Sequence, residues 1–254
     1  MKPKILVTND DGYHAEGILA LEEALKPIAD LYVVAPATEM SGASHSLTLS
    51  RPLRIRKTDE RHWIVDGTPT DCVTLALNQI LRSEELPVLC VSGINPGPNL
   101  GDDATYSGTV AGALESTILG VPGIAFSLVE YRDHDFSESA KVARAITERA
   151  LREGLPKGSL LNVNIPSGVS KGYKATKQGF KDARPMITEH IDPRGKLYYW
   201  IGEVRDGFHE GDGTDFEAIE DGFVSITPMR SDLTDHDSIK LLKQWETNYS
   251  SENG

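Results

Sequence analysis

The sequence predicts an α/β protein with an open, doubly wound and mostly parallel β-sheet that carries helices on both faces. Short continuous apolar segments, typical of strands buried in a parallel sheet, alternate along the chain with segments of helical periodicity. Glycine and proline mark most changes from one kind of segment to the other. The helical periodicity stops near residue 166. We therefore expect one domain over residues 1–254, with a core at about 1–166 and a β-rich extension at about 167–254.

The first strand-helix-strand unit is expected at the N-terminus. The segment Lys4–Thr8 is apolar and ends in polar turn residues, as a buried strand does. After Gly17, apolar residues recur at helical spacing as far as Ile28, and a second apolar strand follows at residues 31–35. Pro36 ends it.

The same alternation continues through the core. Three more helical segments are each followed by a strand-like segment, at about residues 71–81, 88–92, 110–118, 123–127, 137–153 and 160–165. The first of these helices has Thr70 or Asp71 available as its N-cap. In the extension we expect strands at residues 196–201 and 223–227 and a short closing helix around residues 239–245.

The composition limits the classes of function. The formal net charge of −12 repels a polyanionic backbone, so extended DNA or RNA is a poor partner, whereas small phosphate esters remain possible if a metal ion supplies positive charge. Cys72 and Cys90 lie in apolar segments, where buried free thiols are commoner than a disulfide. No apolar run approaches the roughly 20 residues that cross a bilayer, and the N-terminus lacks a leader pattern. We expect no membrane association and a cytoplasmic location.

The strongest candidate for chemistry is the pair Asp10 and Asp11 at the end of the first strand. Adjacent side chains of a strand point to opposite faces, so the two carboxylates converge only where the chain turns, and Gly12 supplies a turn. Neighbouring carboxylates repel each other unless a cation or proton intervenes, and hard divalent cations prefer oxygen ligands. The pair predicts a divalent metal site. The alternative is that one aspartate caps the next helix or forms an Asx turn.

A second polar segment follows the strand at residues 88–92, and the carboxyl ends of parallel strands share one edge of the sheet. Asn95 offers an amide oxygen there, while the backbone amides of Asn99 and Gly101 are candidate donors to an anion. An ordinary Gly/Pro turn is the alternative.

Two further segments are expected at this edge. Ser107 and Thr109 bring hydroxyl groups to a helix N-terminus, which favours phosphate, although Ser107 also suits simple N-capping. The loop at residues 39–46 is rich in small side chains and, taken by itself, is only a loop. His14 and His45 are near enough in sequence to support the site as neighbours of its ligands.

Familiar nucleotide and zinc motifs are missing from the sequence. No G-x-G-x-x-G follows the first strand and no G-x-x-x-x-G-K-[ST] occurs, so dinucleotide-binding and P-loop interpretations lack their phosphate cradles. No clustered cysteines and histidines indicate zinc.

Short motifs instead occur in a recognisable order along nearly the whole chain. They are Thr8-Asn9-Asp10-Asp11-Gly12, Ser41-Gly42-Ala43-Ser44, Asp66-Gly67-Thr68-Pro69-Thr70-Asp71-Cys72-Val73, Ser92-Gly93-Ile94-Asn95, Tyr106-Ser107-Gly108-Thr109-Val110 and Val224-Ser225-Ile226-Thr227-Pro228. In this the chain resembles the SurE-type survival-protein nucleotidases, metal-dependent phosphatases of nucleoside 5′- and 3′-monophosphates. Two departures, Thr70 where alanine is common and Pro98 in the following loop, do not fall on a ligand position.

The resemblance implies a site and an assembly. It implies one divalent ion per subunit, Mg²⁺ or Mn²⁺, held by Asp10, Asp11, Ser41 and Asn95. It implies that phosphate is bound by Asn9, Gly42, Ser107, Gly108 and Thr109, and that Asp10, Asp11 and Asn95 take part in catalysis. It also implies a Rossmann-like core, C-terminal segments exchanged between subunits, and a homodimer or homotetramer.

The function expected on this basis is hydrolysis of nucleoside monophosphates, and possible further substrates are short polyphosphates. Our hypothesis is in-line attack on phosphorus by a metal-activated water, with the general base unassigned. One rival is an aspartyl-phosphate phosphatase with Asp10 as nucleophile, although such enzymes place their two aspartates at alternate positions. Another is a receiver-like signalling module, which is usually about half as long.

Overall fold

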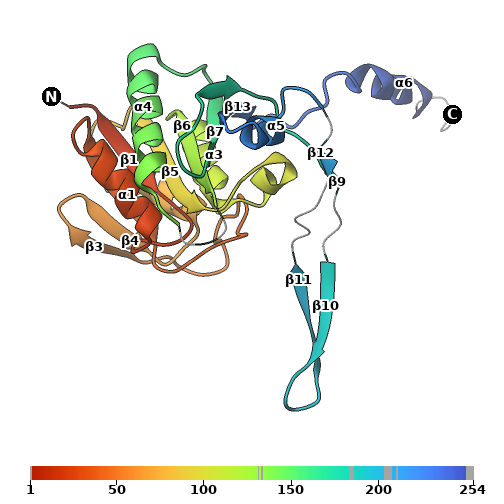
Figure 1. The fold of residues 1–254 in the computed structure, drawn as a ribbon, viewed down its shortest axis with the longest axis horizontal. Coiled ribbons are helices and arrows are strands. Elements are labelled where there is room, and N and C mark those ends of the chain that lie inside the picture. The colour runs from red at the N-terminus through yellow and green to blue at the C-terminus, as the bar shows by residue number, and fades with distance from the viewer. Residues whose placement is uncertain are drawn as a thin grey trace.

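The computed structural model describes residues 2–130, 132, 134–182, 186–202, 208–209 and 211–249. One nine-stranded sheet forms its centre, in the order β3-β4-β2-β1-β5-β6-β7-β13-β8 (Figure 1). The strands from β4 to β7 run parallel, whereas β3 and β13 pair antiparallel with β4 and β7. The predicted mostly parallel α/β fold is confirmed.

The core elements follow the predicted alternation. Their bounds are β1 (Lys4–Thr8), α1 (Glu16–Leu25), β2 (Asp30–Pro36), β3 (Ile55–Asp59), β4 (His62–Val65), α2 (Pro69–Leu75), η1 (Ala76–Ile80), β5 (Leu89–Pro96), η2 (Gly101–Thr105), α3 (Gly108–Ile118), β6 (Gly123–Val129), α4 (Ser137–Glu153) and β7 (Ser159–Pro166).

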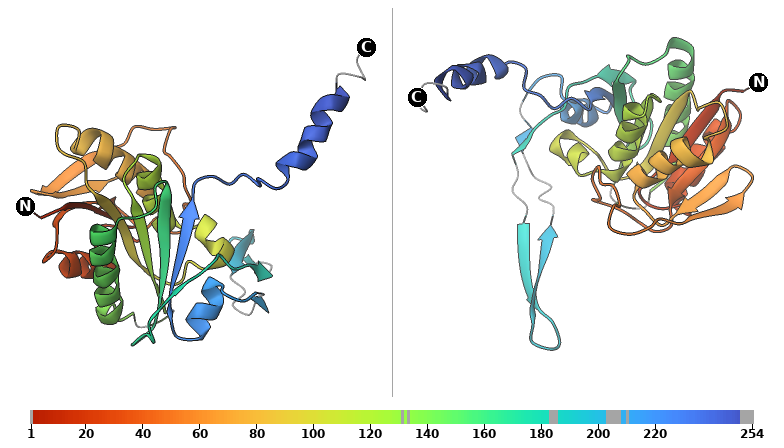
Figure 2. Two further views of the ribbon diagram at one scale, coloured as in Figure 1. Left: turned by 90° about the horizontal axis from the view of Figure 1, so that it is seen from above. Right: turned by 180° about the vertical axis from the view of Figure 1, so that it is seen from behind.

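Helices cover both faces of the sheet, and each face has its own apolar core. Ile5 and Val7 of β1 pack with α1 and α4 on one face, whereas Leu6 packs with α2 on the other. Figure 2 shows the sheet between α1 and α4 on one side and α2 and α3 on the other. Since alternate side chains of a strand point to opposite faces, an unbroken apolar strand supplies both cores at once.

The start of α2 differs from the prediction. Thr68, and not Thr70 or Asp71, is the N-cap, because Pro69 suits the first helical position. The side chain of Thr68 accepts a hydrogen bond from Asp71 N at 3.1 Å, and Asp71 Oδ2 accepts one from Thr68 N at 2.9 Å. This reciprocal pair is a capping box. The helix then continues as the π-helix η1 instead of remaining α-helical to residue 81.

The hairpin of β3 and β4 was not predicted. Four of the five residues of β3 are exposed and polar, so the segment lacks the apolar pattern that marks a buried strand. The predicted free thiols are confirmed, since Cys72 and Cys90 are both buried and unpaired.

The extension returns two strands to the main sheet. Its elements are β8 (Tyr173–Ala175), β9 (Lys181–Asp182), β10 (Met186–Ile191), β11 (Leu197–Gly202), β12 (Phe208–His209), α5 (Asp215–Glu220), β13 (Val224–Arg230) and α6 (Ile239–Tyr249). The strands expected near residues 196–201 and 223–227 correspond to β11 and β13, and the closing helix corresponds to α6.

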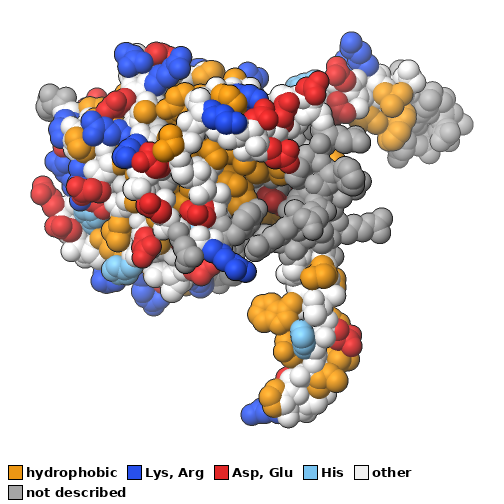
Figure 3. Space-filling model, in the orientation of Figure 1, with side chains coloured by type: hydrophobic (Ala, Val, Ile, Leu, Met, Phe, Trp, Pro, Cys, Tyr) orange, Lys and Arg blue, Asp and Glu red, His pale blue; other side chains and the backbone are white. Residues whose placement is uncertain are grey.

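Two parts of the extension project from the body of the molecule. The antiparallel hairpin of β10 and β11 points away from the sheet, and α6 extends at the C-terminal end (Figure 1). Hydrophobic side chains are visible along both in Figure 3. No helix in the described part of the chain is long and apolar enough to cross a membrane.

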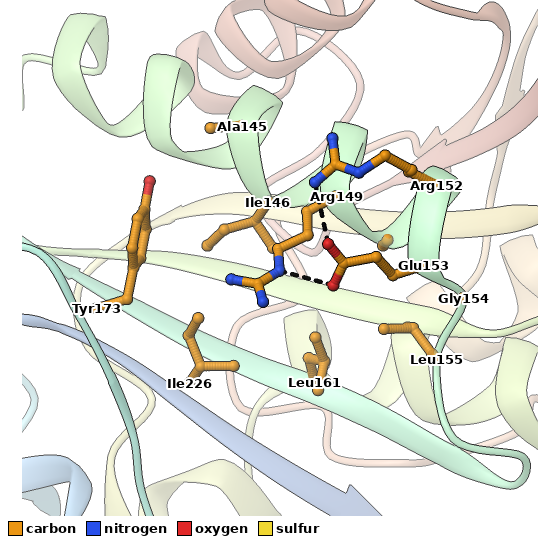
Figure 4. A pocket seen from close by; sticks show the side chains of 11 residues that line it. Ala145, Ile146, Arg149, Arg152, Glu153, Gly154, Leu155, Leu161, Tyr173 and Ile226 are labelled. Carbon is orange, nitrogen blue, oxygen red and sulfur yellow. Dashed lines mark hydrogen bonds and ion pairs between the residues drawn. The ribbon is translucent and has the colours of Figure 1, made fainter.

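A pocket of about 360 Å³ lies between α4 and the sheet strands β7, β8 and β13 (Figure 4). Its floor is apolar, and Arg149 and Arg152 are bonded to Glu153 at its rim. The described residues that line it include none of the predicted site residues. The candidate chemistry lies elsewhere, at the carboxyl ends of β1 and β5.

A candidate acidic site at the carboxyl ends of β1 and β5

Asp10 and Asp11 follow β1 at the point where the strand order of the sheet reverses. β1 lies between β2 and β5, and its last residue, Thr8, pairs with Ser92 of β5. Asp10 and Asp11 therefore leave the sheet at the same edge as Asn95, near the end of β5. Ligands of open α/β sheets bind at such an edge.

The turn after the aspartates requires glycine. Gly12 has φ +102°, and a Cβ there would also lie 3.3 Å from the carbonyl carbon of Thr38. The side-chain nitrogen of Asn9 donates to Gly12 O at 2.9 Å and holds the turn closed. The predicted chain reversal at Gly12 is therefore present.

Asp10 is packed against the N-terminus of α3. Thr109 donates its hydroxyl hydrogen bond to Asp10 Oδ1. Gly108 is so close that a Cβ at its position would lie 2.7 Å from Asp10 Cβ. The backbone of Asp10 also accepts a hydrogen bond from Met40 N at 2.7 Å, so the acidic turn contacts both the helix N-terminus and the loop after β2.

Both carboxyl groups have raised pKa values. Burial raises the pKa of Asp10, although the bond from Thr109 works against it. For Asp11, burial followed by the charges of Asp10 and Glu39 raises the pKa to about 7. Burial, which disfavours the charged form of a carboxyl group, is the main physical cause in both cases.

The chemistry of this turn suits a cation. Asp11 Oδ2 and Asn9 Oδ1 are buried, and neither has a hydrogen-bond partner among the described residues. Oxygen atoms of this kind are the donors that hard divalent cations prefer. No group of three or more His, Cys, Asp or Glu side chains that could hold a metal occurs in the described ranges, so further ligands would have to be amide or hydroxyl oxygens.

Asn95 and Ser41 are the predicted neutral ligands. The side-chain nitrogen of Asn95 donates to Gly97 O at 2.9 Å, so the amide oxygen is the atom with which Asn95 would bind an ion. Ser41 follows Met40, but its hydroxyl donates to Glu39 Oε1 at 2.8 Å. To bind an ion with a lone pair, Ser41 must present the oxygen away from that carboxylate.

Of the predicted phosphate-binding residues, Asn9 follows β1, and the other four lie at the N-terminus of α3 and in the loop after β2. Ser107 is the N-cap of α3 and accepts a hydrogen bond from Val110 N at 3.1 Å, so the simple capping role is present beside the predicted one. Gly108 and Thr109 form the first turn, where backbone amides lack partners within the helix. Gly42 has φ +71° and open space where a Cβ would stand, which allows a close approach to its backbone.

Ser44 joins this loop to the segment before α3. Its amide donates to Tyr106 O at 3.0 Å, and its hydroxyl donates to Thr105 O at 2.7 Å. Two loops that are distant in sequence are therefore hydrogen-bonded to each other beside the N-terminus of α3.

The prediction that the backbone amides of Asn99 and Gly101 donate to an anion is wrong. Asn99 N donates to Asn164 Oδ1 and Gly101 N donates to Asp215 Oδ2, each at 2.8 Å. Both amides form hydrogen bonds that hold the loop after β5, so neither is directed at an anion.

His45, in the loop after β2, contacts Glu115 of α3, whereas His14 is exposed. His45 Nε2 lies 2.8 Å from Oε2 of Glu115 in α3. The ring of His14 meets that of Tyr13 edge-on, with centroids 4.9 Å apart. Glu39 and Glu115 were not predicted as site residues, and the only available signal was the position of Glu39 two residues before Ser41.

These features define a doubly wound α/β protein whose candidate site is a pair of carboxyl groups with raised pKa values, one of which contacts a helix N-terminus. The family model described as "Survival protein SurE" matches residues 5–185. The chain belongs to the SurE family.

Relatives of known name match nearly the full length. A protein named 5′-nucleotidase SurE from Myxococcus xanthus is 50% identical over 248 residues, which cover 96% of this chain and 94% of the relative. A protein of the same name from Aquifex aeolicus is 47% identical, with 96% and 98% covered. The crystal structure of SurE protein from Aquifex aeolicus superposes with a TM-score of 0.86 at 47% identity, covering 96% of this chain and all of that one.

Proposed function

We propose that this protein is a metal-dependent phosphatase that hydrolyses nucleoside 5′-monophosphates to nucleoside and phosphate. Relatives at 47–50% identity that carry the name 5′-nucleotidase support the reaction class. The observation that carries the proposal is the contact of Asp10 with the first turn of α3. Such a site needs a cation beside its carboxylates and favours an anion at the helix N-terminus. A phosphate ester together with a divalent ion meets both requirements.

Four side chains would hold one Mg²⁺ or Mn²⁺ ion. They are the carboxylates of Asp10 and Asp11, the amide oxygen of Asn95 and the hydroxyl of Ser41. When bound, the ion supplies positive charge against the developing charge on phosphorus and lowers the pKa of the attacking water. The two aspartates would orient this chemistry, and Asn95 would be shared between the ion and the substrate.

A second set of residues, at the N-terminus of α3 and in the loop after β2, would bind the phosphate oxygens. Ser107, Gly108 and Thr109 present the N-terminal end of α3, whose dipole and free amides favour negative charge. Gly42 adds a backbone that an oxygen can approach closely. Asn9, whose side-chain nitrogen holds the acidic turn at Gly12, is the remaining residue assigned to the phosphate.

The proposal extends to nucleoside 3′-monophosphates and short polyphosphates, because the residues assigned above recognise the phosphate group and the ion. An extended nucleic acid is a poor substrate for a chain with net charge −12. A panel of 5′-AMP, 3′-AMP and tripolyphosphate, each with Mg²⁺ and Mn²⁺, measures these preferences.

The test of the proposal removes the carboxylate or the ion. Asp10→Asn, and separately a chelator, should abolish phosphate release from 5′-AMP, and added Mn²⁺ should restore the chelated enzyme only. Asp221→Asn is the control, because Asp221 forms an exposed ion pair with Lys174 at 2.7 Å in the extension. Retained activity in Asp10→Asn or in chelator would contradict the proposal. A trapped phosphoryl group on Asp10 would favour the rival mechanism with that residue as nucleophile.

We also propose that the protein self-associates as a homodimer or homotetramer through its extension, with C-terminal segments exchanged. The support is apolar surface that one copy leaves uncovered. Trp200 and Ile201 of the hairpin are 64% and 77% exposed, and Trp245 of α6 is 69% exposed. Large exposed apolar side chains on projecting elements are typical of interaction surfaces.

A further inference from the structure

We infer that Glu115, in the middle of α3, is a positioning residue that holds the loop of Ser41 and Gly42 in register with the N-terminus of its own helix. The inference rests on the proposed function, in which Ser41 binds the ion and Gly42 binds the phosphate. Glu115 itself lies away from the carboxyl edge of the sheet and acts through His45.

Glu115 is a buried carboxylate with two specific partners. It is 6% exposed; His45 Nε2 lies 2.8 Å from Oε2, and Thr74 of α2 donates to Oε1 at 2.7 Å. The bond from His45 is the main cause that lowers the pKa of Glu115. The carboxylate therefore joins α2, α3 and the loop after β2 at one point.

The loop between Met40 and Thr48 depends on a few such attachments. Met40 N contacts the backbone of Asp10, Ser44 contacts the segment before α3, and Thr48 donates its amide and hydroxyl to Asp71 at 2.9 and 2.6 Å. None of these three contacts reaches α3 beyond its first turn, whereas the contact of His45 with Glu115 does. Ser41 and Gly42 themselves are exposed, so their positions are set mainly by these neighbours.

The backbone next to His45 also needs support. Ser44 has φ +54°, a left-handed conformation that residues other than glycine rarely adopt. Such a conformation persists when surrounding contacts hold it. Loss of the contact between His45 and Glu115 would let Ser44 relax and carry Gly42 and Ser41 away from the ion. The N-terminus of α3 would stay in place, because Gly112 packs that helix directly on Thr8 and Ser92.

The chain contains a second histidine-glutamate pair that serves as a matched control. His62 Nε2 lies 3.0 Å from Oε1 of Glu22, and the Glu22 side chain is 10% exposed against 8% for Glu115. This second pair joins α1 to β4 and touches none of the residues assigned to the ion or the phosphate. A general loss of stability should affect both pairs alike, whereas a positioning role belongs to Glu115 alone.

The experiment compares Glu115→Ala, Glu115→Gln, His45→Ala and Glu22→Ala in the full-length protein. Mn²⁺ affinity by calorimetry, kcat and KM for 5′-AMP, and Tm are measured for each. Glu115→Ala and His45→Ala should weaken Mn²⁺ binding and lower kcat/KM by about tenfold or more, as loss of a ligand's supporting partner does. Glu115→Gln should recover part of both, because its amide can still bond His45 or Thr74. Glu22→Ala should lower Tm while its Mn²⁺ affinity and kcat/KM stay within about twofold of wild type.

Two results would overturn the inference. One is wild-type Mn²⁺ affinity and kcat/KM in His45→Ala, a substitution at a side chain that is 33% exposed and therefore tolerated by the fold. The other is an equal loss of Mn²⁺ affinity and kcat/KM in Glu22→Ala, which would show that the losses come from lower stability and not from positioning. Failure of the proposed function has a different signature, namely a wild-type protein that neither binds Mn²⁺ nor releases phosphate.

Discussion

Thr109, in the first turn of α3, donates its hydroxyl hydrogen bond to Oδ1 of Asp10 at the end of β1. One contact thereby joins a candidate metal ligand to a candidate phosphate-binding residue. It also compensates part of the burial of Asp10, whose pKa the bond lowers against the larger effect of desolvation. The acidic turn and the helix N-terminus are therefore one site in this fold.

Thr109→Val should show how much this hydrogen bond contributes to the free energy of unfolding. Valine keeps the shape of the side chain but leaves a buried carboxylate without its hydroxyl donor, which costs about 1–3 kcal/mol in the free energy of unfolding. Urea denaturation at pH 8, where Asp10 is charged in the unfolded chain, measures the loss. Thr109→Ser keeps the hydroxyl and should remain close to wild type. Equal stability of the valine and serine variants would contradict the assignment.

Gly108→Ala should disrupt the site although alanine favours helices. The added Cβ would meet Asp10 Cβ at 2.7 Å and Oδ2 at 2.9 Å, and Asp10 is too buried to move aside freely. We expect lower stability, in place of the roughly 1 kcal/mol gain that the helix propensity of alanine would bring, together with loss of phosphate release. Tm and activity on 5′-AMP are the measurements. A variant that is both more stable and fully active would show that Gly108 and Asp10 are not in contact.

The raised pKa of Asp11 makes stability depend on pH in the presence of a chelator. The pKa of Asp11 is about 7 in the folded protein, against an ordinary aspartate value of 3.8, so between these values the folded protein holds the proton more strongly than the unfolded chain does. The contribution of Asp11 to the free energy of unfolding should therefore fall as pH rises from about 4 to about 7, and level off above that. The slope of a single such group is about 1 kcal/mol per pH unit.

Asp11→Asn isolates this effect from the other carboxyl groups. Asparagine does not titrate, so the stability of the variant relative to wild type should increase between pH 5 and pH 7 in urea denaturation with chelator. Saturating Mn²⁺ should stabilise the wild type and not the variant. A difference between the two proteins that is the same at every pH would contradict the raised pKa.

Trp200→Glu should weaken self-association. Trp200 lies in β11 of the projecting hairpin and is 64% exposed, and a charge at such a position opposes burial against a second copy. Sedimentation velocity should show a smaller assembly for this variant. Val169→Glu is the control, because Val169 is 86% exposed but lies outside the hairpin and α6. An unchanged assembly in Trp200→Glu would exclude the hairpin surface around this residue from the interface.

Much of the core could be predicted because its strands are continuous apolar segments. β1, β2, β5, β6 and β7 are buried almost throughout, so their pattern is visible in sequence. β3 escaped prediction because its exposed residues show no such pattern. The N-cap of α2 was predicted at Thr70 or Asp71 instead of Thr68, because all three are capping residue types. Only the position of Pro69 in the helix decides between them.

The sequence by itself determined the acidic turn and the edge of the sheet on which it lies. Local chemistry is sufficient there, since Asp10 and Asp11 follow a buried strand and Gly12 permits the turn. Only the tertiary structure decided which distant groups complete the site. Thr109 is 99 residues from Asp10, and Glu115 is 70 residues from His45. Each contact depends on how closely α3 packs on the sheet. Whether a backbone amide is free to bind a ligand depends on its neighbours in the fold, and the amides of Asn99 and Gly101 are bonded to Asn164 and Asp215. Hydrogen-bond partners across such separations are set by packing and cannot be read from local patterns.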